Sequence, residues 1–162
     1  NHALGLDVSA KMVSEAKKRN SNKQIHFDVL SENRQSADWE LFDIAIMSSV
    51  MHHITPENRE EVLADVFRLL KPTGKLVIVE HNPWNILTQL VVRSTQVDRE
   101  AILLSHKNLG LEVKHLGYLF SQPRYFLCVP PAWPFSNGVD SFLRHLPLGG
   151  QWISVVTKAA GD

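Results

Sequence analysis

The chain has 162 residues, no formal net charge and one cysteine, Cys128. This length fits a single domain, and the balanced charge without a basic stripe argues against nucleic acid as a partner. A lone cysteine allows no internal disulfide and fits a reducing compartment, and no apolar run is long enough for a transmembrane helix. We therefore expect one cytoplasmic domain over residues 1–162.

The first part of the chain predicts a strand, a helix and a second strand. Ala3 to Val8 is a short apolar run, and Ser9 is suited to cap the helix that follows, in which Met12 falls at helical spacing. Residues 25–29 form the second strand candidate. Residues 31–39 are polar and predict a loop or a short helix.

The middle of the chain predicts one βαβ unit. Phe42 to Ser48 is almost continuously apolar, as expected of a strand covered on both faces by helices. Thr55 and Pro56 then begin an amphipathic helix, Lys71 to Gly74 form a turn, and Leu76 to Val79 form another buried strand. Small-molecule sites in such sheets form at the carboxyl ends of the strands.

The last part of the chain predicts a helix or lid, a helix, a strand, an irregular proline-rich stretch and a closing strand. These segments are residues 85–93, residues 98–109 with Gly110 at the end, residues 111–120, residues 123–147 and residues 151–157. The order indicates an α/β fold: Rossmann-like and doubly wound, with a mostly parallel sheet and an antiparallel edge strand.

Two neighbouring histidines follow the strand at residues 42–48. A metal site is not predicted for His52 and His53, because adjacent residues point to different sides and no second ligand pair stands at a useful spacing. We expect one histidine to be structural and the other to face a pocket, where it could take a proton from a substrate hydroxyl. His52 is favoured for the packing role, which leaves His53 as the catalytic candidate.

Three polar residues, Glu80, His81 and Asn82, follow the strand at residues 76–79. They are consistent either with a capped turn around Pro83 or with a substrate-facing wall that offers His81 as a second base. The sequence does not separate these two interpretations. Side chains that could line an acceptor pocket, although each is more often core or rim, are Trp84, Arg93, Tyr118 and Tyr125.

Several of these segments, in this order, resemble class I S-adenosylmethionine-dependent methyltransferases between residue 3 and about residue 158. The resemblance is carried by Leu6-Asp7-Val8-Ser9 with Met12, by Phe42 through Ile54, and by Leu69 through Leu76. Residues 80–85 and 146–151 indicate a narrower group within this family. They resemble a bacterial subgroup of small-molecule methyltransferases, some of which resemble enzymes that act on glycan or lipid-linked substrates.

The resemblance implies S-adenosylmethionine as cofactor and methyl transfer to a small-molecule, glycan or lipid-linked acceptor. Asp7 would hold both ribose hydroxyls, although an acid that only ends a strand would look the same. Asp28 would contact the adenine amino group, unless it only forms a turn. The cofactor-binding residues that the resemblance implies are Asp7, Val8, Met12, Asp28, Val29, Ser48 and Ser49.

The sequence departs from this family at its start, where the family's first strand and Gly-rich loop are absent. We expect either a fragment or a truncated relative, incomplete at the N-terminus, that binds the cofactor weakly or not at all. Unpaired strand edges are costly, so the remaining strands would pair directly, swap between two chains of a homodimer, or recruit a partner.

Two other functions stay open. The missing loop favours a non-catalytic methyltransferase-like remnant that acts as an interaction module. An acid at the end of the second strand also suits a nicotinamide-dependent oxidoreductase, but the Leu-Lys-Pro-Thr-Gly turn at residues 70–74 and the closing edge strand fit a methyltransferase better.

Overall fold

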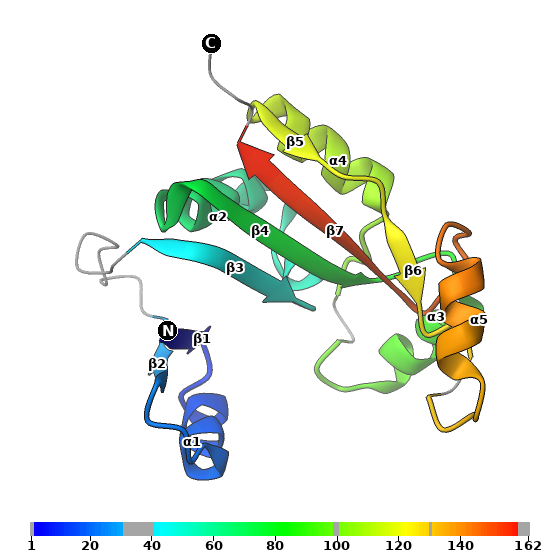
Figure 1. The fold of residues 1–162 in the computed structure, drawn as a ribbon, viewed down its shortest axis with the longest axis horizontal. Coiled ribbons are helices and arrows are strands. Elements are labelled where there is room, and N and C mark those ends of the chain that lie inside the picture. Colours follow the sequence, from blue (N-terminus) through cyan, green and yellow to red (C-terminus); the bar gives the residue numbers. More distant parts are fainter. Residues whose placement is uncertain (1, 31–40, 99–100, 130, 159–162) are drawn as a thin grey trace. The chain divides into compact units, whose positions relative to one another are not determined.

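The computed structural model describes residues 2–30, 41–98, 101–129 and 131–158 (Figure 1). The chain forms two compact units, residues 1–38 and residues 39–162. The predicted segment at residues 31–39 lies outside the described residues, and the prediction of a single domain over residues 1–162 stays a prediction. Within the described ranges, no helix has the length and hydropathy that crossing a membrane requires.

The smaller unit is a strand, a helix and a parallel strand, as the sequence predicts. Its elements are β1 (Ala3–Asp7), α1 (Ala10–Arg19) and β2 (Ile25–Val29). β1 and β2 pair in register from Ala3 opposite Ile25 to Asp7 opposite Val29. The hydroxyl of Ser9 accepts a hydrogen bond from the backbone N–H of Met12 at 3.3 Å, which confirms the predicted helix cap.

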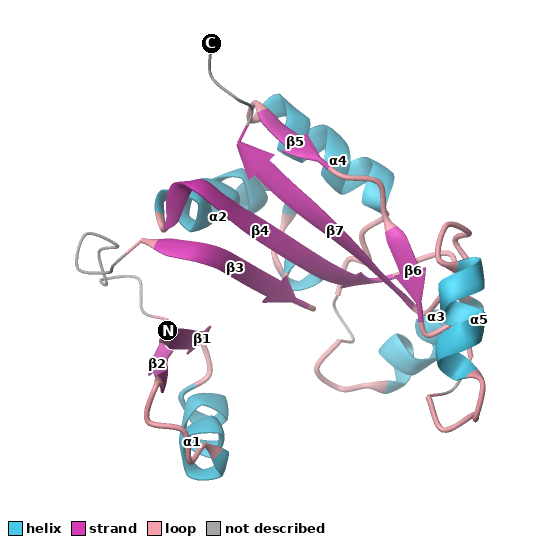
Figure 2. Cartoon of the chain, viewed as in Figure 1, coloured by secondary structure: helices cyan, strands magenta, loops and turns pink. Residues whose placement is uncertain are grey.

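The larger unit is built on a five-stranded sheet (Figure 2). Its elements are β3 (Phe42–Ser48), the short 3-10 helix η2 (Met51–His53), α2 (Pro56–Arg68), β4 (Leu70–His81), α3 (Ile86–Ser94), α4 (His106–His115), β5 (Tyr118–Phe120), β6 (Arg124–Phe126), α5 (Ser136–Leu143) and β7 (Gln151–Lys158). β3 and β4 are parallel, and β7 runs antiparallel to β4. The α/β class is therefore confirmed. The antiparallel strand does not lie at the edge, because β5 and β6 pair with the side of β7 that faces away from β4.

Helices α2 and α4 cover one face of this sheet and form the core with it. The buried residues at the centre are Met47, Leu63, Ile78, Leu109, Val113, Trp152 and Val156. On the other face of β3, Ile44 and Ile46 are 58% and 69% exposed. Within the larger unit both core helices lie on the same side of the sheet, so the prediction that β3 is covered on both faces stays a prediction.

Several predicted boundaries differ from the structure. The strand predicted over residues 111–120 is only Tyr118–Phe120, because residues 111–115 belong to α4. The turn at residues 71–74 is an irregularity inside β4, where partners of β3 shift from Leu70 to Lys75. The helix predicted from residue 98 begins at His106 and continues through Gly110 to His115. A side chain at Gly110 would lie 2.9 Å from the ring of Phe120, so this glycine permits close packing instead of ending the helix.

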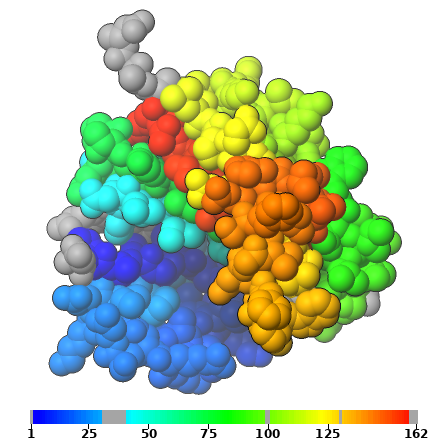
Figure 3. Space-filling model, turned by 45° about the vertical axis from the view of Figure 1, so that its right-hand side comes forward, coloured from blue at the N-terminus to red at the C-terminus, as the bar shows by residue number. Residues whose placement is uncertain are grey.

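The proline-rich stretch is more regular than its composition predicts. It contains β6 and α5, and α5 lies on the visible surface in orange (Figure 3). Both elements are short, and the carboxylate of Asp140 in α5 accepts from the backbone N–H groups of Leu127 and Cys128. A side-chain contact between distant segments, which no local pattern predicts, therefore orders this stretch.

Candidate functional site

A buried glutamate at the end of β4 organises the loop that follows β3. Glu80 is fully buried, and its Oε1 accepts from the backbone N–H groups of Val50 and Met51 at 3.0 and 2.7 Å. Its Oε2 lies 2.5 Å from Nδ1 of His52. Since a carboxylate only accepts, Nδ1 of His52 is the donor and Nε2 faces the other way. Three N–H donors satisfy the buried charge.

The charge of Glu80 also sets the protonation of His52. Burial lowers the pKa of His52, but the hydrogen bond to Glu80 and the negative charges of Glu80 and Asp98 raise it more. The net result is a pKa above the ordinary histidine value. Glu80 on β4 thus both holds the imidazole of His52 through a hydrogen bond and raises its pKa.

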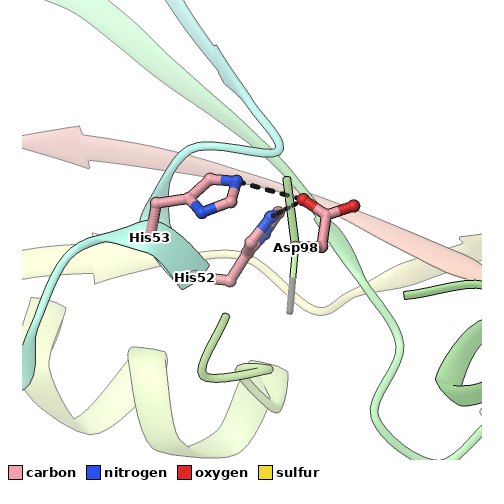
Figure 4. A group of neighbouring side chains, drawn as sticks. All are labelled: His52, His53 and Asp98. Carbon is pink, nitrogen blue, oxygen red and sulfur yellow. Dashed lines mark ion pairs between the residues drawn. The ribbon is translucent and has the colours of Figure 1, made fainter. Parts of the chain in front are cut away.

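Asp98, from the segment that follows α3, brings the two histidines together. Its Oδ1 lies 3.2 Å from Nε2 of His53 and 3.7 Å from Nε2 of His52. Figure 4 shows both rings directed at this carboxylate. The backbone N–H of Ile102 donates to the carbonyl of His52 at 2.8 Å, which fastens the segment after Asp98 to η2.

The reason given from sequence for rejecting a histidine cluster is wrong. Adjacent residues diverge in an extended strand, but in η2 the ring centroids of His52 and His53 are 4.2 Å apart. One nitrogen of each ring and one oxygen of Asp98 all lie within 4.8 Å of one another. Sequence reasoning missed Asp98, because an isolated acid in a polar segment has no characteristic spacing to either histidine.

The two histidines divide as expected between a buried and an accessible position. The side chain of His52 is 1% exposed, whereas that of His53 is 39% exposed. His52 is held by a carboxylate, and its side chain is part of the cluster, so its position is not explained by packing alone.

His81 lies on the flank of this cluster. It is half-buried, and its ring centroid is 5.1 Å from that of His52. Burial lowers the pKa of His81, and the charge on His52 lowers it further against the opposing effect of Glu80. The side chain is therefore neutral near pH 7.

The other residues after β4 are structural. The side-chain amide of Asn82 donates to the carbonyls of Pro147 and Gly149 at 3.0 and 2.7 Å, and that of Asn85 donates to Leu148 at 2.7 Å. The two restrictive motifs, residues 80–85 and 146–151, thus bind each other. Of the three polar residues that follow the buried strand, only His81 is left for a substrate-facing role.

A cavity of about 370 Å³ lies beside the cluster and shares Asp98 with it. Its other lining residues are Pro83, Gln89, Val92, Arg93, Ala101 and Leu103. Arg93 thus contributes to this cavity, whereas Trp84 is 71% exposed. Tyr118 stacks on Phe67 with ring centroids 3.6 Å apart, and both line a different cavity. The carboxylate that holds the histidines is accessible from the first of these cavities.

Of the cofactor-binding residues predicted in the smaller unit, Asp7, Val8, Asp28 and Val29 lie at the ends of its strands, and Met12 lies in the first turn of α1. Asp7 is exposed, and its Oδ1 accepts from the backbone N–H of Ser9 at 2.7 Å. Val8 and Met12 are 76% and 58% exposed. Asp28 accepts from the N–H of the next residue, Val29, at 2.9 Å.

The remaining two predicted cofactor residues are in the larger unit, where Ser48 is the last residue of β3 and Ser49 follows it. Ser49 has a φ of 55°, an uncommon value for a residue other than glycine, and its N–H donates to Val79 at 2.8 Å. It stays a prediction that all seven residues bind one cofactor: Asp7, Val8, Met12, Asp28, Val29, Ser48 and Ser49.

Comparison with known proteins places these features in a family context. A family model described as a methyltransferase domain matches residues 1–74. An uncharacterized methyltransferase of Synechocystis sp. is 33% identical over 85 residues, which are 52% of this chain and 39% of that protein. The chain therefore spans about two fifths of the length of this curated relative.

Solved structures match over nearly the whole chain. An S-adenosylmethionine dependent methyltransferase from Mesorhizobium loti is 15% identical with a TM-score of 0.65, covering 96% of this chain and 79% of that one. A SAM dependent methyltransferase from Archaeoglobus fulgidus is also 15% identical, with a TM-score of 0.63 and coverage of 96% and 75%. These matches confirm the resemblance drawn from the sequence: the chain has the fold of class I S-adenosylmethionine-dependent methyltransferases.

Proposed function

We propose that this chain belongs to an enzyme that transfers the methyl group of S-adenosylmethionine to a small-molecule, glycan or lipid-linked acceptor. The observation that carries the proposal is the methyltransferase-domain match over residues 1–74, which contain β1, β2, β3 and the polar residues at their ends. The nicotinamide alternative has no comparable support. The lone cysteine and the bacterial relative are consistent with a bacterial cytoplasmic protein.

The cofactor is assigned to residues at the ends of β1, β2 and β3 and, for Met12, in the first turn of α1. Asp7 is exposed at the end of β1 and retains carboxylate lone pairs that can accept from both ribose hydroxyls. Asp28 and Val29 are assigned to the adenine, Val8 and Met12 to the apolar surface beside it, and Ser48 with Ser49 to the region of the sulfonium.

The reaction is a direct displacement at the methyl carbon. The acceptor's lone pair forms the new bond to carbon while the carbon–sulfur bond breaks, and the electron pair stays on the sulfur of S-adenosylhomocysteine. The sulfonium is already a good leaving group, so the protein contributes mainly alignment and exclusion of water. A hydroxyl acceptor also loses a proton, for which His81 and His53 are the candidate bases.

The cavity beside Asp98 is the proposed entry for the acceptor. Helix α3 lines it through Gln89, Val92 and Arg93, and a guanidinium suits a hydroxyl-rich or phosphate-bearing group. The rest of α3 exposes apolar side chains: Ile86, Leu87, Leu90 and Val91. This combination favours an acceptor with a polar and an apolar part, as in a lipid-linked glycan.

Calorimetric titration with S-adenosylhomocysteine tests the cofactor assignment. The protein is expressed as this chain and again with any coding sequence that is translated in frame before residue 1. We expect weak or no binding to the chain alone, and in the longer form we expect Asp7→Ala to weaken binding about tenfold or more, as the loss of a charged hydrogen bond does.

Glu15→Ala, which removes an exposed acid from α1, serves as the matched control and should leave the affinity unchanged. Equal affinity of Asp7→Ala and the unmodified protein would contradict the ribose assignment. Failure of every form to bind the cofactor would favour the alternative of a non-catalytic interaction module.

A further inference from the structure

We propose that His52, His53 and Asp98 bind a divalent transition-metal ion of the zinc class. The three side chains come from η2 and from the segment after α3, and both segments belong to the larger unit. Their ligand atoms all lie within 4.8 Å of one another. This inference concerns the larger unit alone and does not depend on cofactor binding. With His53 as a metal ligand, His81 is the base that remains for a hydroxyl acceptor.

The strongest evidence is the buried nitrogen of His52. The side chain is 1% exposed, and among the described residues its Nε2 has no hydrogen-bond partner. A proton on Nε2 would need an acceptor within about 3.2 Å, but Oδ1 of Asp98 is 3.7 Å away. A lone pair on Nε2 that coordinates a metal removes this cost, because the ion replaces the missing partner.

Glu80 prepares His52 for that role. Its Oε2 accepts from Nδ1 at 2.5 Å, which fixes the ring orientation and leaves Nε2 as the ligand atom. Histidines that bind metals usually donate their other ring N–H to a carboxylate or carbonyl in this way. The backbone N–H groups of Val50 and Met51 hold the same carboxylate, so the ring is oriented before any ion binds.

The distances from Oδ1 of Asp98 to the two histidine nitrogens are close to those around a tetrahedral ion, and all three ligand atoms lie within 4.8 Å of one another. Ligands at the usual zinc–nitrogen and zinc–oxygen lengths are separated by about 3.3–3.6 Å. Oδ1 of Asp98 lies 3.2 Å from Nε2 of His53 and 3.7 Å from Nε2 of His52.

The ligand types select the class of ion. Two imidazoles and one carboxylate suit zinc and its transition-metal neighbours, whereas magnesium and calcium prefer sites made of oxygen ligands. Three protein ligands leave a fourth position, as in catalytic zinc sites. Asp98 also lines the cavity of about 370 Å³, so a small ligand could reach that position from the cavity.

Zinc binding to the full chain, after removal of metals with a chelator, tests the proposal. Zn²⁺ is titrated in competition with a chromogenic chelator, and Co²⁺ is used as a probe because its visible absorption reports coordination by nitrogen and oxygen. We expect one Zn²⁺ per chain. We expect Mg²⁺ not to compete.

Variants separate this site from adventitious binding. His53→Ala and Asp98→Ala each remove one ligand and should weaken Zn²⁺ binding by at least about 100-fold, the upper range for loss of an outer-shell partner. Glu80→Gln should weaken it by about 10- to 100-fold. His115→Ala removes an exposed histidine at the end of α4 and should have no effect.

The outcome is decisive because His53 is accessible and lies outside the buried Glu80–His52 pair, and circular dichroism verifies that the variant is folded. Absence of stoichiometric Zn²⁺ uptake by the unmodified chain would overturn the proposal. Equal affinity, or an equal Co²⁺ spectrum, for His53→Ala and the unmodified chain would overturn it as well.

Discussion

Both units end a parallel strand with an acid, yet the two acids have different environments. Asp7 at the end of β1 is exposed and accepts from the backbone N–H of Ser9. Glu80 near the end of β4 is fully buried and accepts from three N–H groups, one of them on His52. The same sequence pattern thus produces an accessible acceptor in the smaller unit and an internal anchor in the larger one.

The difference follows from burial. A charge removed from water must be satisfied by protein groups, so Glu80 has to organise the loop around itself. An exposed carboxylate keeps lone pairs for a ligand, because water satisfies it in the absence of one. The environment of a strand-end acid therefore decides whether it positions protein or binds a ligand, and the following substitutions test this contrast.

The largest effect is expected from Glu80→Ala. It leaves the N–H groups of Val50, Met51 and His52 without their acceptor, and the loss of a partner from a buried pair costs about 3–5 kcal/mol. Urea unfolding of the full chain measures it. Glu61→Ala, an exposed glutamate of α2, is the control and should have little effect. A loss below about 1 kcal/mol for Glu80→Ala would show that water replaces the anchor.

A smaller loss of stability is expected at Gly149, which belongs to the motif at residues 146–151 and packs against β6. A side chain at Gly149 would lie 2.3 Å from the carbonyl oxygen of Phe126. Gly149→Ala must therefore displace backbone and should destabilise by about 1–3 kcal/mol. Gly138→Ala is the matched control, because nothing lies near that position in α5 and alanine favours a helix. Equal stabilities of the two variants in the same unfolding assay would contradict this packing.

The sequence predicts those parts of the fold that depend on local patterns. Ser9 as a cap, Pro56 at the first turn of α2 and the apolar strands β3 and β4 follow from side-chain preferences and spacing. The sequence predicts a helix end at Gly110, which is wrong, because this glycine packs against the ring of Phe120 from β5. A glycine ends a helix only when its backbone leaves the helical conformation. The sequence alone does not distinguish such a glycine from one that permits close packing.

In the candidate site, too, local patterns predict some features, and others depend on the tertiary structure. His53 and His81 were recognisable as accessible imidazoles after strands, but the partner of His53 was not. Asp98 approaches the histidines through the fold of the segment after α3, and the 3-10 turn of η2 makes the two rings converge. Neither fact leaves a periodic signal in the sequence.

Asp7→Ala tests the other half of the contrast, that the exposed acid matters for ligand binding and little for stability. The side chain is exposed, so we expect its removal to change the free energy of unfolding much less than Glu80→Ala does. Its effect should appear in S-adenosylhomocysteine binding instead. A loss of stability comparable to that of Glu80→Ala would show that Asp7 also serves as an anchor.

The smallest effect is expected from His106, a partly buried histidine of the larger unit, on the pH dependence of stability. His106 is partly buried, its Nε2 lies 2.9 Å from the carbonyl of Ser121, and its ring stacks on Phe120. Burial lowers the pKa of His106, and the charge of Lys114 adds to this against the opposing hydrogen bond to Ser121. The folded state therefore takes up this proton less readily than the unfolded state.

The direction of the pH dependence follows from that difference. Below the unfolded histidine pKa of about 6.5 the unfolded chain is protonated first, so this residue makes stability fall as the pH drops from 7 toward its lower folded pKa. In His106→Phe the ring stacking is retained and the titration is removed. We expect this variant to be less stable at pH 7.5, because the hydrogen bond is lost, but to lose less stability on acidification. His52 and His81 titrate in both proteins, so the difference between their pH profiles isolates His106. Parallel profiles between pH 7.5 and 5 would mean that the imidazole titrates alike in the folded and unfolded chain.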